Sequence, residues 1–140
     1  MYEKLLVPVD GSESSARALA HAVSLARSLP VPPELVVLHV NPSFAMNEPP
    51  IGVNLEEAVE EEGRRILEPA VAALKDAGIP YRSLARNGDP AEIILRLARE
   101  EECGLIVMGS RGNGLVKELL LGSVSHAVIQ QARCPVMIVK

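Results

Sequence analysis

The chain has 140 residues, of which 48% are hydrophobic and 23% are charged, and its formal net charge is −4. These proportions are typical of a compact globular domain, and we expect one domain that spans residues 1–140. The negative balance argues against a general nucleic-acid binder, and the 2% of aromatic residues offers too few rings for base stacking. We therefore expect no nucleic-acid partner.

The N-terminus, the apolar runs and the cysteines indicate a compartment. Glu3 and Lys4 lead directly into a strand, so we expect no signal peptide. No apolar run reaches the ~18 residues that a membrane span needs, so we expect no membrane partner. Cys103 and Cys134 match no metal or redox spacing, which favours small buried thiols in a reducing compartment. The sequence therefore predicts a cytoplasmic protein.

Aliphatic runs and helical periodicity alternate along the first half of the chain. Residues 4–9 and 35–40 are short aliphatic runs, as buried strands are. Residues 13–28 and 55–77 show the helical spacing of apolar residues, and residues 41–54 predict a proline-containing loop. The predicted buried stripe of the first helix is Ala16, Leu19, Ala20, Val23 and Ala26.

The second half continues this alternation. Residues 81–86 alternate in polarity and carry two arginines, which favours an edge strand. Asp89 and Pro90 begin a helix, because Asp caps a helix well and Pro fits its first position. The remaining segments are a strand at 105–108, a helix at 124–132 and a strand at 135–139. Strands that alternate with helices predict an α/β fold, in which helices cover both faces of a parallel sheet.

A glycine-rich connection follows the fourth predicted strand. It contains Gly109, Gly112 and Gly122, and Ser123 and Ser125 follow at the start of the last helix. Glycine lets the backbone come close to a ligand, and a helix N-terminus with free amides and small hydroxyls binds anions. The connection therefore predicts a phosphate site. The alternative is a tight strand-to-helix turn that binds nothing.

The spacing Gly-x2-Gly-x9-Gly-Ser of this loop resembles the nucleotide motif of the universal stress protein family, in its ATP-binding branch. Residues 7–12 (VPVDGS) and 134–139 (CPVMIV) are similar to the same family, so the resemblance spans essentially the whole chain. It implies a doubly wound, Rossmann-like sheet of five parallel strands in the order 3-2-1-4-5, as in the adenine nucleotide α-hydrolases. Ligands of such sheets bind where the strand order reverses, here between strands 1 and 4.

The loop residues are assigned to the phosphates of a nucleotide. The residues expected to contribute backbone amides are Gly109, Gly112, Gly122, Ser123, Val124 and Ser125, and both serine hydroxyls can donate as well. Arg111 can pair with a phosphate as a planar fork, and its alternative is a solvated loop arginine.

The resemblance adds five residues around the rest of the nucleotide: Pro8, Val9, Asp10, Val40 and Met108. It implies that Asp10 accepts from the ribose hydroxyls or helps to position a metal, and that Val40 presents its backbone to the adenine edge. The alternatives are a helix cap for Asp10 and plain core for Met108. The implied cofactor is ATP, with AMP or ADP as alternatives, and Mg²⁺ or Mn²⁺ would accompany the phosphates.

The function expected from this resemblance is an ATP-binding universal stress protein that acts as a nucleotide-dependent sensor or regulatory module in the stress response. The Walker loop, the dinucleotide G-x-G-x-x-G and the hydrolase G-x-S-x-G are absent from the sequence. Asp10 is the only carboxylate placed in the site, so we expect a protein that is not an enzyme and hydrolyses ATP slowly at most. The alternatives are an ATP hydrolase or nucleotidyl-transfer enzyme, and an interaction module that binds no nucleotide.

The last predicted strand, residues 135–139, suggests how the protein assembles. In the order 3-2-1-4-5 this strand lies at a sheet edge, and it is apolar on both faces with only Lys140 after it. An unprotected edge invites another chain. Because many universal stress proteins dimerise through this strand, the resemblance implies a homodimer. The alternative is that the loop at 41–54 covers the edge.

Overall fold

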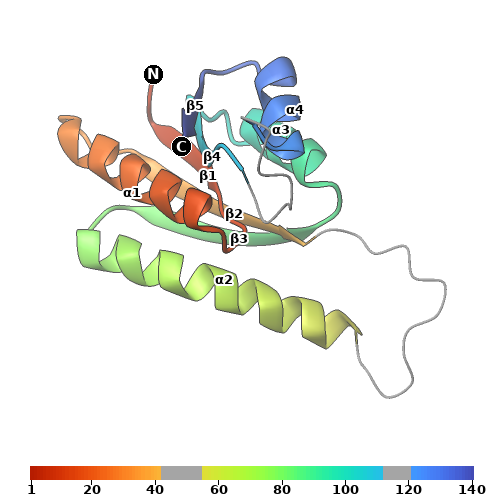
Figure 1. Ribbon diagram of the computed structural model, residues 1–140. Coiled ribbons are helices and arrows are strands. Elements are labelled where there is room, and N and C mark those ends of the chain that lie inside the picture. The colour runs from red at the N-terminus through yellow and green to blue at the C-terminus, as the bar shows by residue number, and fades with distance from the viewer. Residues whose placement is uncertain (42–54, 112–120) are drawn as a thin grey trace.

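The computed structural model describes residues 1–41, 55–111 and 121–140, which form one five-stranded parallel sheet with two helices on each face (Figure 1). The strand order is β3-β2-β1-β4-β5, which confirms the predicted doubly wound fold. The elements are β1 (Lys4–Pro8), α1 (Glu13–Ser28), β2 (Glu34–Asn41), α2 (Leu55–Ala77), β3 (Tyr81–Asn87), α3 (Pro90–Glu100), β4 (Leu105–Gly109), α4 (Ser123–Gln131) and β5 (Val136–Val139).

Alternate residues of the central strands supply two separate aliphatic cores. Leu5 and Val7 of β1 face α1 and α2, whereas Leu6 faces α3 and α4. The neighbouring strands β2 and β4 divide their side chains in the same way. Figure 1 shows the two helix layers on opposite sides of the sheet. Because the central strands are buried on both faces, they read in the sequence as uninterrupted aliphatic runs.

The buried stripe of α1 differs from the predicted one. Leu19 and Ala26 are buried as predicted and Val23 is half-buried, but Ala16 and Ala20 are exposed, and the buried residues that were not predicted are Ser14, Ser15, Ala18 and Ala22. Hydropathy could not distinguish these faces, because alanines recur on both. The orientation of α1 is decided by its first turn, where Ser14 packs against the end of β4.

Gly109, the last residue of β4, permits this close approach. A Cβ atom at Gly109 would lie 2.7 Å from the carbonyl carbon of Ser14, closer than real Cβ atoms come to backbone. The hydroxyl of Ser14 donates to the carbonyl of Val139 at the end of β5, and it accepts from the amide of Arg111, both at 3.4 Å. The sequence therefore needs glycine at position 109 for the packing of α1, whether or not a ligand binds.

Both cysteines belong to the core on the α3 and α4 side of the sheet. Cys103 is buried, Cys134 is half-buried, and both are free thiols. Burial raises the pKa of the Cys103 thiol to about 11, and burial also raises the pKa of Cys134. Since the thiolate is the reactive form, these values fit the predicted structural role. No helix in the described ranges is both long and apolar enough to cross a membrane.

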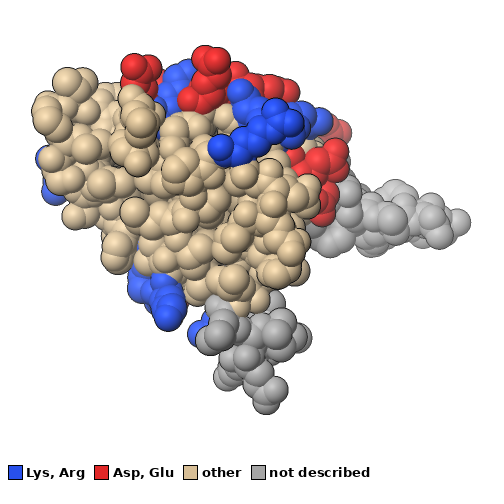
Figure 2. Space-filling model, turned by 90° about the horizontal axis from the view of Figure 1, so that it is seen from above, with Lys and Arg blue, Asp and Glu red and all other residues tan. Residues whose placement is uncertain are grey.

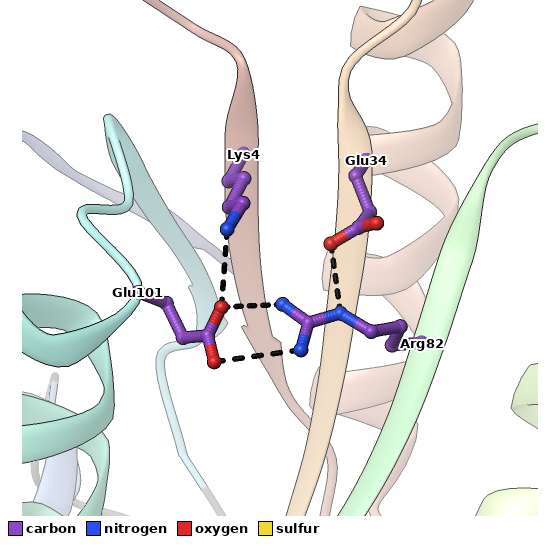
Figure 3. A network of polar contacts seen from close by, with 4 residues as sticks. All are labelled: Lys4, Glu34, Arg82 and Glu101. Atoms are coloured by element: carbon purple, nitrogen blue, oxygen red, sulfur yellow. Dashed lines mark hydrogen bonds and ion pairs between the residues drawn. The ribbon is translucent and has the colours of Figure 1, made fainter.

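A chain of ion pairs joins the amino ends of three strands to the end of α3 (Figure 3). Arg82 of β3 contacts Glu34 of β2 at 2.8 Å and also pairs with Glu101, which in turn contacts Lys4 of β1 at 3.2 Å. The hydrogen bond from Arg82, followed by the one from Lys4, lowers the pKa of the Glu101 carboxyl to about 2. Only 22% of the Glu101 side chain is exposed, so solvent weakens this pair less than a surface pair.

The first prediction compares two glycines. Gly109→Ala should lower the free energy of unfolding by ~1–3 kcal/mol, because α1 must move away from β4. In Gly63→Ala the new methyl would lie 3.6 Å from the nearest atom, the Cδ2 of His39, which is an ordinary contact. This control should be neutral or more stable by up to ~1 kcal/mol, because alanine favours helix. Urea denaturation measures both, and wild-type stability of Gly109→Ala would refute the packing argument.

The second prediction concerns pH. A carboxylate whose pKa falls on folding stabilises the protein above its unfolded pKa, and this stabilisation is lost as pH falls through the folded pKa. Glu101→Gln should therefore lower the free energy of unfolding by about 1 kcal/mol or less at neutral pH. The difference from wild type should shrink between about pH 4.5 and about pH 2 in urea denaturation. Glu100→Gln, an exposed neighbour, is the control, and an equal effect of both variants would contradict the role of the network.

Candidate functional site

A cavity of about 590 Å³ lies at the carboxyl ends of β1, β2 and β4. It is located where the strand order reverses between β1 and β4, the position at which doubly wound sheets bind ligands. Eleven of the twelve predicted site residues line it: Pro8, Val9, Asp10, Val40, Met108, Gly109, Arg111, Gly122, Ser123, Val124 and Ser125. The twelfth, Gly112, lies outside the described residues.

The start of α4 faces this cavity with its backbone amides uncapped. The N-cap residue is Gly122, which has no side chain to cap the helix, whereas Ser12 caps α1 and Asp89 caps α3. The amide of Gly122 donates to the carbonyl of Ser110 at 2.7 Å, so the amides that remain for a ligand belong to the first turn of the helix itself. Amides of this kind and the helix dipole together attract an anion.

Ser125 has a different role from the one predicted for its hydroxyl. The hydroxyl is buried and faces two carbonyls, those of Ser110 and Gly122, each at 3.0 Å. Since a hydroxyl has a single proton, that proton is used within the loop in this structure. Ser125 therefore stabilises the turn into α4, whereas Ser123 is exposed and lines the cavity.

Asp10 lies in a tight turn between β1 and α1. Its Oδ1 accepts from the amide of Ser12 at 2.9 Å, and its own amide contacts the hydroxyl of Ser15 at 3.3 Å. The cap of α1 is Ser12, whose Oγ accepts from the amide of Ser15 at 3.1 Å, so Asp10 is not the capping residue. Gly11 has a φ of +84°, which a turn of this shape requires. These bonds hold the Asp10 carboxylate in a fixed position on the cavity wall.

Val40 presents its backbone to the cavity. The amide of Val9 donates to the carbonyl of Leu38 at 2.8 Å, whereas the carbonyl of Asn41 accepts from Gly88 after β3 at 2.9 Å. In a parallel strand, the amide and the carbonyl of one residue both face the same neighbouring strand, and those of the next residue both face the other. Those of Val40 therefore face the β1 side, beyond the point where β1 ends at Pro8. A planar ring with donors and acceptors on one edge could pair with them there.

The wall around Val40 is apolar. Met108 is 5% exposed and belongs to the core on the α3 and α4 side, so it is both core and cavity lining, and the two predicted alternatives hold together. Leu38 and Ile94 extend the same surface. In the part of the chain that the structure describes, the charged lining residues are Asp10, Glu62 and Arg111.

The sequence did not indicate ten of the lining residues, namely Ser15, Leu38, His39, Asn41, Ala58, Val59, Glu62, Ile66, Pro90 and Ile94. Most of them belong to helices that approach the cavity only through tertiary packing. The one available signal was local, since Leu38, His39 and Asn41 adjoin the predicted Val40. Among the described residues there is no group of three or more side chains that could hold a metal ion.

Comparisons with known proteins show which family the chain is similar to. The family model for the universal stress protein family matches residues 1–140. The universal stress protein YxiE from Bacillus subtilis is 39% identical, with each chain covered over its whole length.

Two solved structures share the fold. The protein MJ0577 from Methanocaldococcus jannaschii superposes with a TM-score of 0.90 at 33% identity, covering 100% of this chain and 96% of that chain. A universal stress protein family protein from Arabidopsis thaliana, solved with AMP bound, has a TM-score of 0.75 at 25% identity and covers 98% and 90% of the two chains. With a family model that matches from end to end and a relative at this level of identity, the chain belongs to the universal stress protein family.

Proposed function

We propose that this protein binds an adenine nucleotide in the cavity at the carboxyl ends of β1, β2 and β4, and that it acts as a nucleotide-dependent sensor or regulatory module in the stress response. The observation that carries the proposal is the placement of three features around one cavity. These are the uncapped start of α4, the fixed carboxylate of Asp10 and the outward backbone of Val40. The AMP-bound relative from Arabidopsis thaliana supports an adenine nucleotide as the ligand class.

Each feature suits one part of a nucleotide. The amides of Ser123, Val124 and Ser125 suit the phosphates, and Arg111 can add a planar fork to them. A carboxylate such as that of Asp10 accepts hydrogen bonds from the two ribose hydroxyls. The backbone of Val40 suits the hydrogen-bonding edge of adenine, which would lie on the apolar surface that includes Met108. The preferred nucleotide under this proposal is ATP.

A metal ion would enter with the phosphates. The described residues offer no cluster of metal ligands, so Mg²⁺ or Mn²⁺ would be held mainly by phosphate oxygens and water. Of the lining residues, Asp10 is the carboxylate at the carboxyl ends of the strands, and its Oδ1 is already bonded to Ser12. The protein would therefore position the phosphates that hold a metal ion, and would supply few metal ligands itself.

The competing proposal is an ATP hydrolase, which needs a base beside the terminal phosphate. The described carboxylates of the cavity are Asp10, which is held in the turn after β1, and Glu62, which lies on α2. The groups that the start of α4 offers to a phosphate are backbone amides and hydroxyls, which bind an anion but do not activate water. Incubation with ATP and Mg²⁺ should therefore give turnover far below the ~1 s⁻¹ of a slow enzyme. Enzyme-like turnover that Asp10→Ala abolishes would favour the hydrolase.

The third prediction tests the phosphate site at α4. Ser123→Glu places a carboxylate in the first turn of α4, where the helix dipole favours it, so the fold should be retained. The same carboxylate repels phosphate, and the dissociation constant for ATP should rise at least tenfold, which corresponds to ~1.4 kcal/mol. Ser123→Gln, of the same size without the charge, is the control. Isothermal titration should show the largest effect with ATP, a smaller one with AMP and none with adenosine.

Two outcomes would contradict the nucleotide proposal. Equal ATP affinities of the Glu and Gln variants would remove the phosphates from the start of α4. A wild-type protein that binds neither ATP nor AMP would favour the interaction module that binds no nucleotide.

We also propose that two copies of the chain associate through β5, which lies at the end of the strand order. Two large hydrophobic residues near the C-terminal end of the sequence are exposed: Met137 of β5 is 36% exposed, and Ile129 of α4 is 41% exposed. Figure 2 views the molecule from above, the side on which α4 and β5 lie in Figure 1, and most of that face is uncharged. An apolar edge with unpaired amides and carbonyls favours antiparallel pairing with a second copy about a two-fold axis.

The fourth prediction tests this dimer. Wild-type protein at micromolar concentration should have about twice the 15.0 kDa mass of one chain in light scattering. Met137→Lys should shift the mass toward the monomer, because a buried, unpaired ammonium is costly at an interface. Val31→Lys alters a residue that is 78% exposed and lies before β2, and it should leave the mass unchanged. A monomeric wild type would refute the proposal.

A further inference from the structure

A chain of polar side chains runs along the cavity wall from the end of β1 to the end of β3, and two of them, His39 and Asn41, are buried. His39 of β2 is 5% exposed, and its Nδ1 lies 2.9 Å from the carbonyl of Val9. Its Nε2 lies 2.9 Å from the Oδ1 of Asn41, whose Nδ2 donates to the Oδ1 of Asn87 at 3.1 Å. Helix α2 covers the chain at Gly63, where an added Cβ would lie 3.6 Å from the His39 ring. None of the nucleotide contacts proposed above uses these side chains.

The hydrogen bonds of His39 depend on its protonation. The carbonyl of Val9 can only accept, so Nδ1 must carry a proton. In the arrangement observed, Nε2 faces the Oδ1 of Asn41, and a ring that donates from both nitrogens to these two acceptors is an imidazolium. A neutral ring with its proton on Nδ1 would need a donor at Nε2. Asn41 would then have to turn its amide over, and Asn87 would have to follow.

Among the described residues, two carboxylates and one cation line the cavity together with His39. The charged residues that share the cavity wall with it are Asp10 at the end of β1, Glu62 on α2 and Arg111 after β4. Its register partner on β3 is Ala85, and the residue that α1 contributes to the wall is Ser15, neither of which is charged.

We propose that His39 is a positioning residue for the nucleotide, and that its protonation strengthens nucleotide binding. The inference rests on the proposed nucleotide site. The imidazolium makes a charge-assisted hydrogen bond to the carbonyl of Val9, the residue that precedes Asp10, and so it holds the turn that presents the ribose contact. It also places a positive charge on the wall of a cavity that receives phosphates. Both effects act in the same direction, so affinity rises as pH falls.

The experiment measures the ATP affinity of the whole protein by isothermal titration between about pH 8 and about pH 5.5, the range in which histidine changes charge. The phosphates of the nucleotide also change charge in this range. Because wild type and variants bind the same nucleotide, this contribution cancels when their affinities are compared at each pH. The affinity of wild type should gain about fivefold more on acidification than that of His39→Gln. His21→Gln changes an exposed histidine of α1 and should follow wild type.

A second variant changes Asn87, the last residue of the hydrogen-bonded series that begins at His39. Asn87 is exposed, so Asn87→Asp should fold normally. A carboxylate at position 87 can only accept, which fixes the Nδ2 of Asn41 toward it and the Oδ1 toward His39. The affinity of this variant should therefore remain high at a pH where that of wild type has declined. A purely structural role of His39 would not produce this shift.

Nitrogen NMR of the histidine rings in the free protein gives an independent readout. The Nδ1 of His39 should stay protonated throughout, while Nε2 loses its proton as pH rises. An unprotonated Nδ1, or parallel affinity profiles of wild type and His39→Gln with nucleotide bound, would overturn the proposal and leave the nucleotide site intact. A wild type that binds no nucleotide at any pH would instead refute the proposed function, and the coupling with it.

Discussion

The contact between the first turn of α1 and the end of β4 determines the shape of the cavity. Gly109 lets the backbone of Ser14 approach β4, and Ser14 then connects Arg111 to the carbonyl of Val139. This contact fixes the end of β4 relative to the end of β1, because β1 is followed directly by α1. Because the strand order reverses between these two strands, the contact also sets the width of the opening in which a ligand can lie. A methyl group at position 109 would therefore alter the site without touching a ligand.

The two halves of the cavity differ in how they are built. Around the start of α4 the available groups are backbone amides, and the side chain of Ser125 is committed to supporting them. Around α2 the wall consists of side chains, including His39, Asn41 and Glu62. Backbone amides bind any phosphate and tolerate exchange of the side chains beside them. Under the proposed function, the α2 half would therefore set the response to conditions, and the α4 half would supply the phosphate contacts.

The sequence predicted every element boundary to within one residue, because the aliphatic runs are short and are separated by glycine, proline and capping residues. It failed where residue type carries no directional information. Alanines occur on both faces of α1, and only the contact between Ser14 and Gly109 decides which of them are buried. The strand order came from the resemblance and not from periodicity, which is the same for several parallel topologies.

The candidate site was predicted where it is contiguous in the sequence, and missed where tertiary packing assembles it. Residues after β1 and before α4 follow strand ends or precede a helix, so their position at the carboxyl edge could be inferred. Ala58, Val59 and Ile66 reach the cavity because α2 lies across the sheet, and no local pattern distinguishes them from other residues of an amphipathic helix. The hydroxyl of Ser125 shows a further limit, because residue type indicates what a group can donate and only coordinates show which acceptor it uses.

The buried part of the polar chain, His39 and Asn41, has a cost that hydrophobic residues at the same positions would avoid. Polar side chains as buried as His39 and Asn41 lose hydration, and the protein recovers that free energy only if every donor meets an acceptor. For His39 this condition holds in one protonation state with the amides as observed, and in the other only after two amides turn. An aliphatic pair would pack against Gly63 without this constraint. Polar residues at these positions therefore sacrifice stability for an arrangement that depends on pH, and they do so on the wall of the cavity, where such a dependence can act on a charged ligand.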